Sequence, residues 1–120
     1  MTKRILLVST STVYGKPYLS YIMPDVAKFF KGSTKLLFIP YAKPGGISLD
    51  DYSAVAAKAF AEGGLTIKGI HKWKNPLQAI RECDGIFTGG GNTFLLLKTL
   101  QEKNLLQAIR EKVQSGTPYM

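Results

Sequence analysis

Residues 85–97 read Gly-Ile-Phe-Thr-Gly-Gly-Gly-Asn-Thr-Phe-Leu-Leu-Leu, and this stretch decides the fold class. The short apolar run at 85–88 predicts a buried strand that ends at the three glycines. Asn92 then predicts the cap of a helix whose apolar residues are Phe94, Leu95, Leu97 and Leu100. A buried strand followed at once by a helix is typical of a parallel α/β sheet.

The same alternation extends in both directions along the chain. Further strands are predicted at 4–9, 35–40 and 65–70, where apolar residues run together or alternate. The residues after Gly116, Thr117 to Met120, resemble the opening of one more strand. Parallel strands joined by helices form a sheet that is covered on both faces, and ligands gather outside the carboxyl ends of such strands.

Helix patterns lie between the predicted strands. One pattern begins at Pro17 and runs to Phe30, and Pro24 inside it is expected to kink the helix or reset its start. A second runs from Asp50 to the glycine pair at 63–64, with a buried face expected to contain Tyr52, Val55, Ala56, Ala59 and Phe60. A short helix follows Asn75-Pro76, and a last one starts near Leu105 and is closed by Gly116.

Composition narrows the class of protein. The 120 residues suffice for one domain, and 45% hydrophobic with 20% charged residues is ordinary for a globular protein. The formal net charge of +8 comes from basic residues spread along the chain, only three of them Arg, so a solvated lysine surface is favoured over a nucleic-acid interface. No apolar run is long enough to span a membrane, and no signal peptide is recognised, so we expect a cytoplasmic protein.

The single cysteine, Cys83, excludes an intramolecular disulfide and fits a reducing compartment. Its neighbours Glu82 and Asp84 are acidic, which disfavours a thiolate, so a structural role is expected. One cysteine and one histidine, His71, make a poor metal site, and no metal or cofactor is expected.

The strongest chemical signal is the turn Gly89-Gly90-Gly91 with Asn92 and Thr93 behind it. Glycines let a backbone approach a ligand closely, and the following helix directs free N–H groups and the positive end of its dipole at the same place. Such a turn can bind a phosphate or hold the oxyanion of an acyl-transfer intermediate, or it can be a purely structural tight turn. It lacks the Gly-Lys-Ser/Thr ending of a P-loop and the spacing of a dinucleotide fingerprint.

Weaker candidates follow the first two predicted strands. Ser9-Thr10-Ser11-Thr12 could bind a ligand, although hydroxyl groups more often cap helices and turns. The loop after Ile39 carries Gly45-Gly46 and could be a lid or a plain connection. His71 lies among lysines, which disfavours a general base, and no Ser-His-Asp set can be assembled from these residues.

Taken together, four stretches resemble the peptidase E (α-aspartyl dipeptidase) family along all 120 residues. They are Leu-Leu-Val-Ser-Thr-Ser-Thr at 6–12, Phe-Ile-Pro-Tyr-Ala at 38–42, Gly-Ile-His at 69–71, and Gly-Gly-Gly-Asn-Thr-Phe with its Leu-Leu-Lys at 89–98. The resemblance implies a flavodoxin-like parallel sheet flanked by helices, similar to class I glutamine amidotransferases. It also implies that residues 1–120 are the N-terminal half of one such domain.

The resemblance implies a serine hydrolase that cleaves dipeptides with an N-terminal aspartate (Asp-X) without a metal or cofactor. The nucleophile would lie three positions past Met120, with the histidine and acid further on, so this chain alone should be inactive. Gly91 matches the glycine whose N–H contributes to the oxyanion hole. Gly89 and Gly90 shape its turn, and Asn92, Thr93, Ser11 and Thr12 match positions for substrate binding.

One departure concerns position 10, where the family usually has Asn and this chain has Thr10. Whether the C-terminal half is a separate chain, and whether the protein forms a homodimer, stay open. Two other functions also stay open. One is a cyanophycinase-like hydrolase, which usually has Gln near the position of Asn92, and the other is a non-catalytic half-domain that binds a ligand or partner through the glycine turn.

Overall fold

The computed structural model describes residues 3–6, 19 and 21–120. Its sheet contains three parallel strands in the order β2-β1-β3: β2 is Ile67–Gly69, β1 is Leu36–Ile39 and β3 is Gly85–Thr88. In the register, Leu36 lies opposite Ile67 on one side and Gly85 on the other. The predicted parallel α/β sheet is therefore confirmed.

The two ends of the described chain extend this sheet beyond β3. Tyr119 forms parallel bridges with Ile86 and with Ile5. The Met120 N–H donates to the Ile86 carbonyl at 2.8 Å, and the Tyr119 N–H donates to the Arg4 carbonyl at 2.9 Å. Residues 118–120 thus lie between β3 and the N-terminal segment, as the predicted strand opening requires, while 7–9 of the predicted first strand lie outside the described residues.

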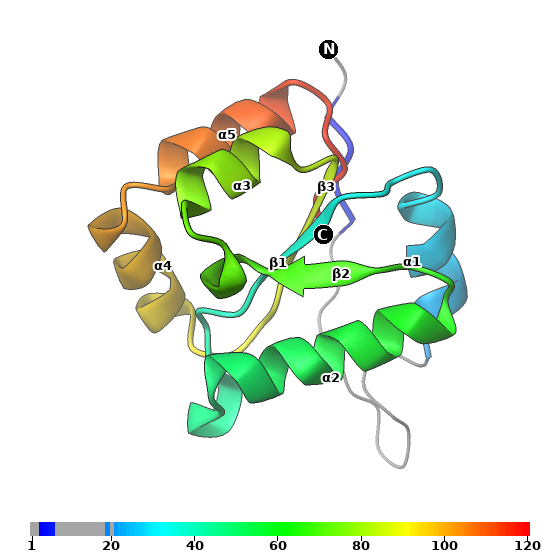
Figure 1. The fold of residues 1–120 in the computed structure, drawn as a ribbon, viewed down its shortest axis with the longest axis horizontal. Helices are drawn as coiled ribbons and strands as arrows, with labels where there is room; N and C mark the ends of the chain where they lie inside the picture. Colours follow the sequence, from blue (N-terminus) through cyan, green and yellow to red (C-terminus); the bar gives the residue numbers. More distant parts are fainter. Residues whose placement is uncertain (1–2, 7–18, 20) are drawn as a thin grey trace.

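Helices cover both faces of the sheet (Figure 1). On one face lie α1 (Met23–Phe29) and α2 (Leu49–Glu62), and on the other lie α3 (Pro76–Glu82) and α5 (Leu106–Gln114). Helix α4 (Thr93–Glu102) stands at the periphery, beyond the carboxyl end of β3. Two short 3-10 turns, η1 (Pro44–Gly46) and η2 (Ile70–Lys72), follow β1 and β2.

Side-chain caps set the starts of the helices. Asn75 and Asn92 each accept a hydrogen bond from the N–H three residues ahead, at 3.2 and 3.0 Å, so both predicted caps are confirmed. Pro24 lies in the first turn of α1, which shows that it resets the helix start rather than kinking its middle. The predicted start at Pro17 lies outside the described residues.

Two details of the pattern differ from the prediction. The strand expected at 65–70 is shorter, because Ile70 opens η2 and its carbonyl accepts a hydrogen bond from the Trp73 N–H at 3.2 Å. On α2, Val55 is 38% exposed, whereas Ser53 is 6% exposed and faces β2. The buried face of α2 is therefore rotated toward position 53, because the helix must cover the edge strand as well as the centre of the sheet.

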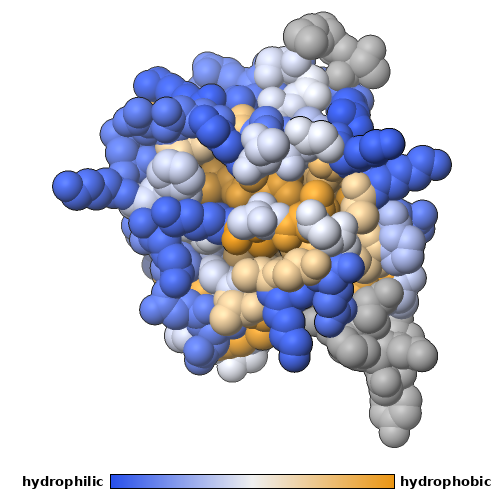
Figure 2. All heavy atoms as spheres, turned by 45° about the vertical axis from the view of Figure 1, so that its right-hand side comes forward, coloured by the Kyte–Doolittle hydropathy of each residue, from blue (hydrophilic) through white to orange (hydrophobic). Residues whose placement is uncertain are grey.

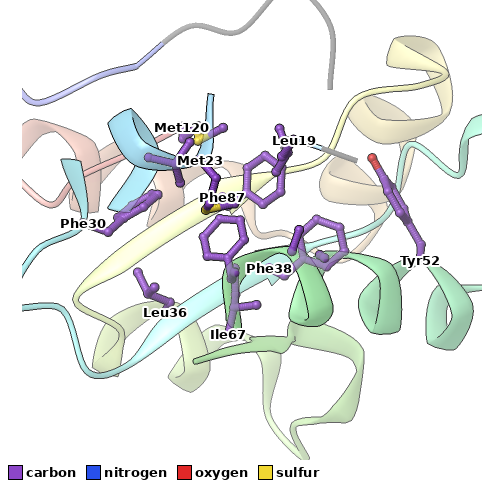
Figure 3. Packing of buried hydrophobic residues seen from close by; sticks show 13 residues of the cluster. Leu19, Met23, Phe30, Leu36, Phe38, Tyr52, Ile67, Phe87 and Met120 are labelled. Carbon is purple, nitrogen blue, oxygen red and sulfur yellow. The ribbon is translucent and has the colours of Figure 1, made fainter. Parts of the chain in front are cut away.

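The core beneath α1 and α2 is aromatic. Phe38 of β1 packs between Tyr52 of α2 and Phe87 of β3, with ring centroids 5.0 and 5.2 Å away (Figure 3). Phe60 stacks on Phe87 at 5.2 Å and lies 6.0 Å from Phe30. Aromatic pairs of this geometry add to the free energy gained from burial, so they fix α2 firmly over the sheet.

Asp84 ties the start of β3 to the start of β1. Its carboxylate accepts hydrogen bonds from the Lys35 N–H at 2.8 Å and the Thr34 N–H at 2.9 Å, and the Thr34 hydroxyl lies at 3.3 Å. Partial burial opposes ionisation of Asp84, but these donors outweigh it and hold its pKa below the usual value. The folded state therefore binds the Asp84 proton more weakly than the unfolded state does.

We expect this carboxylate to stabilise the fold above about pH 4, the range in which an unfolded aspartate is ionised. The contribution should disappear as the pH falls through the lowered folded-state pKa. In urea titrations at pH 7, Asp84→Asn should lower the free energy of unfolding by about 1–2 kcal/mol. At pH 3 the difference between the two proteins should shrink, and an equal difference at both values would contradict this account.

Candidate active site

The turn at residues 89–91 joins β3 to α4 and is held by the neighbouring strand. The Gly89 N–H donates to the Ile39 carbonyl of β1 at 3.0 Å. Gly89 itself is buried, and a Cβ at this position would collide with the Tyr52 hydroxyl. A glycine is therefore needed here for the close approach of Tyr52 rather than for an unusual backbone conformation.

Gly91 is required for a different reason. Its φ is +144°, and a Cβ would lie 2.8 Å from the Pro44 nitrogen and 2.9 Å from the Ala42 carbonyl oxygen. The next residue is anchored to the same loop, because the Asn92 N–H donates to the Ala42 carbonyl at 2.9 Å. The loop that follows β1 thus packs directly on the glycine turn and holds it in place.

The turn presents unused hydrogen-bond donors to solvent. Within the described part of the chain, the N–H groups of Gly90 and Gly91 donate to no acceptor, and both residues are exposed. They stand at the N-terminus of α4, where the helix dipole adds positive potential. Two free donors at a helix N-terminus can hold a negatively charged oxygen, either on a phosphate or on a tetrahedral intermediate.

The last residue of the chain lies beside the end of β3, just before this turn. The Thr88 N–H donates to the Met120 carbonyl at 2.8 Å, and Thr88 immediately precedes Gly89. Any backbone that continues from Met120 in the strand direction advances by about 3.3 Å per residue alongside Gly89, Gly90 and Gly91.

The other residues singled out in the sequence have different locations. Ser11 and Thr12 lie outside the described residues. Gly45 and Gly46 form η1 next to Pro44, so the loop after β1 does border the turn. Asn92 and Thr93 are exposed at the start of α4, where Asn92 caps the helix through its side-chain oxygen.

His71 belongs to a separate pair at the end of β2. Its Nε2 lies 2.8 Å from the Asp50 carboxylate at the start of α2, and the Lys72 ammonium lies 3.8 Å from the same oxygen. The hydrogen bond from His71, followed by the charge of Lys72, holds the pKa of Asp50 below its usual value. This arrangement fixes η2 against α2, and His71 is engaged there rather than at the glycine turn.

Tyr52 of α2 contacts the turn, which its sequence pattern did not predict. The pattern assigned it only to the buried face of α2, yet its hydroxyl donates to the Gly90 carbonyl at 2.9 Å. The signal in the sequence was weak, since a tyrosine on a buried helix face needs a partner for its hydroxyl but its position does not reveal which one. The contact orients the peptide between Gly90 and Gly91.

Removing the Tyr52 hydroxyl should loosen the turn without disturbing the core, because the ring stays in place. We expect Tyr52→Phe to lower the free energy of unfolding by about 0.5–1.5 kcal/mol, the value of one hydrogen bond. Amide hydrogen exchange of Gly89 and Asn92, whose N–H groups donate to the Ile39 and Ala42 carbonyls, should become faster in the variant. Unchanged exchange at both residues would show that the loop after β1 alone holds the turn.

A cavity of about 200 Å³ lies at the opposite ends of the strands. It is lined by residues of β1 and β2, among them Leu37, by Trp73 after η2 and by Cys83 after α3. Figure 2 shows it as an apolar hollow ringed by hydrophilic side chains. Cys83 is buried, and burial raises the pKa of its thiol, in agreement with a structural role.

The described residues include neither a cluster of metal ligands nor a helix able to span a membrane. In ranges 3–6, 19 and 21–120, no three His, Cys, Asp or Glu side chains gather as a metal site. Among the described helices, none combines the length and the apolar character that crossing a membrane requires.

A parallel sheet flanked by helices, with a glycine turn at the carboxyl end of β3, is typical of a flavodoxin-like α/β protein. The chain belongs to peptidase family S51, whose family model matches residues 5–120. It is 46% identical to Peptidase E of Shewanella sp. (strain W3-18-1) over 122 aligned positions, and 42% identical to Peptidase E of Shewanella denitrificans over 120.

Each of these alignments covers all of this chain but about half of the relative, 50% and 51% respectively. The chain therefore spans about half the length of the curated relatives it matches. A stretch of similar length in those proteins has no counterpart among these 120 residues.

Solved structures agree with the fold assignment. A peptidase E protein from Listeria monocytogenes EGD-e superposes with a TM-score of 0.71 at 25% identity, covering 98% of this chain and 56% of that one. A peptidase from an acI-B1 Actinobacterium superposes with a TM-score of 0.65 at 20% identity, covering 92% and 50%. The flavodoxin-like fold, similar to class I glutamine amidotransferases, is thus confirmed.

Proposed function

We propose that this chain supplies the oxyanion-binding half of a serine-dependent dipeptidase that cleaves dipeptides with an N-terminal aspartate. The observation that carries the proposal is the juxtaposition at the turn. The free N–H groups of Gly90 and Gly91 stand at the N-terminus of α4, and the Met120 carbonyl lies beside Thr88, two residues before Gly90. We infer that a C-terminal half, like the one in the relatives, brings the nucleophile to this place.

The chemistry would be acyl transfer in two stages. A serine hydroxyl of the second half attacks the scissile carbonyl while a histidine accepts its proton, and the Gly91 N–H stabilises the oxyanion that forms. The histidine returns the proton to the leaving amine as the peptide bond breaks. Water then attacks the acyl-serine, the histidine again moves the proton, and the free aspartate is released.

Several features support an acidic dipeptide as the substrate. The formal net charge of +8 favours the approach of an acidic dipeptide. Asn92 and Thr93 are exposed beside the turn, where their side chains can contact bound substrate, and we assign Ser11 and Thr12 to the same role. Within this proposal the protein acts in the cytoplasm and requires no metal.

The substrate assignment is tested by joining this chain to the second half of the W3-18-1 relative and comparing three dipeptides. We expect Asp-Leu to be cleaved with a kcat/KM at least about 100-fold above that for Asn-Leu and Leu-Leu, because a site built for a carboxylate rejects its neutral analogues. If the joined protein ignores Asp-Leu while cleaving the others, the specificity proposed here is wrong.

A second function is favoured by one observation. The two free N–H groups at a helix N-terminus suit a phosphate as well as an oxyanion. A non-catalytic module of this kind would bind inorganic phosphate in solution. In that case the joined protein should hydrolyse none of the three dipeptides, while NMR signals of Gly90 and Gly91 should shift on addition of phosphate.

A further inference from the structure

Helix α4 carries apolar side chains on more than one face. Leu96 and Leu100, four residues apart, point into the core formed with α3 and α5. Phe94 and Leu97, three residues apart, share a different face and are 82% and 46% exposed. A helix that is apolar on several faces is typical of one that is covered on several sides.

The neighbouring helix α5 shows the contrast. Its apolar residues, among them Ala108 and Ile109, are buried or partly covered, and its exposed face is polar. On α4 the most exposed large apolar side chain of the described residues, Phe94, lies next to the glycine turn. Figure 1 shows α4 at the rim of the molecule, with α3 and α5 on one side of it only. Nothing in the described part of the chain covers the Phe94–Leu97 face.

The position of Met120 indicates what covers this face. Residues 118–120 run parallel to β3 and end level with Thr88, one residue before the turn that opens α4. A backbone that continues from there reaches the N-terminal end of α4 within a few residues. In the Shewanella relative the aligned 122 residues make up 50% of the protein, so a second half of equal length follows or flanks this region.

We propose that the Phe94–Leu97 face of α4 is a docking surface for that second half of the domain, with Phe94 as its anchor. This docking surface rests on the proposed function in one respect: both assume that the domain consists of this chain and a second half. Buried aromatic side chains contribute most to such interfaces. The second half would therefore be positioned by the same helix whose N-terminus holds the oxyanion.

The test measures binding, without substrate, between this chain and the second half of the W3-18-1 relative produced as a separate polypeptide. Isothermal titration calorimetry should give a Kd that rises about 30-fold or more for Phe94→Ser, the effect expected of an interface anchor. Leu97→Ser should raise it less. Val55→Ser is the matched control, because Val55 is an exposed apolar residue on α2, and its Kd should stay within about twofold of the unchanged chain.

Because Phe94 is exposed in this chain, its replacement should leave the circular dichroism spectrum unchanged. Equal affinity of the Phe94→Ser variant and the unchanged chain would overturn the proposal, as would no binding by the unchanged chain. A self-dimer that light scattering detects and that Phe94→Ser abolishes, with binding to the second half unaffected, would assign the face to a second copy instead. The two halves could form a complex that depends on Phe94 but does not hydrolyse Asp-Leu. That result would support the docking surface and contradict the proposed dipeptidase function.

Discussion

Joining this chain to the second half of a peptidase E relative is expected to raise Asp-Leu hydrolysis about a million-fold over the 120-residue chain alone. That factor is the loss observed when a serine hydrolase lacks its nucleophile. The oxyanion donors that we propose are the N–H groups of Gly90 and Gly91 in this chain, while the proposed serine, histidine and acid all belong to the second half. Donors without a nucleophile can stabilise an intermediate but cannot form it.

The measurement compares initial rates of aspartate release by the chain alone, by the second half alone and by the joined protein, at equal concentrations. Only the joined protein should turn over. Substantial hydrolysis by the 120-residue chain alone, above the rate with buffer, would contradict the division of the site. Such hydrolysis would mean that a nucleophile and its general base both lie within these 120 residues.

The second large effect is expected from Gly91→Ala in the joined protein. A Cβ at this position would lie 2.8 Å from the Pro44 nitrogen and 2.9 Å from the Ala42 carbonyl, both backbone atoms, and the φ of +144° is unfavourable for alanine. The turn must therefore shift, and its N–H leaves the place where the oxyanion develops. Loss of one such donor lowers kcat about 100- to 1,000-fold.

Gly90→Ala provides the matched control, one residue away on the same turn. A Cβ at Gly90 meets nothing within 4 Å, and Gly90 does not have a positive φ. This variant should keep its kcat within a few-fold of the unchanged protein. If Gly91→Ala also keeps its kcat, the Gly91 N–H is not an oxyanion donor, and the turn has a structural role.

Much of the fold follows from local patterns in the sequence. The strand at 85–88, the glycine turn and the Asn92 cap were all predicted from neighbouring residues, because strand pattern, φ freedom and capping are local properties. The Pro24 effect on α1 was predicted as one of two alternatives, and the structure decides between them.

What could not be predicted depends on contacts between distant residues. Pro44 and Ala42 explain why position 91 must be glycine, but they lie almost fifty residues before it. Val55 was predicted on the buried face of α2, but Ser53 is buried instead. This difference depends on how α2 packs over β2. Phe94 was predicted as one apolar residue of α4, and only the structure shows that it is exposed.

The central claim is that the nucleophile comes from the second half and acts beside the turn at 89–91. The most direct test treats the mixed halves with a fluorophosphonate, which reacts covalently with activated serines, and measures the denaturing intact mass of each polypeptide. We expect one adduct on the second half, formed only when this chain is present, and an unmodified mass of 13.2 kDa for this chain. An adduct on this chain, or equal labelling of the second half in its absence, would contradict the claim.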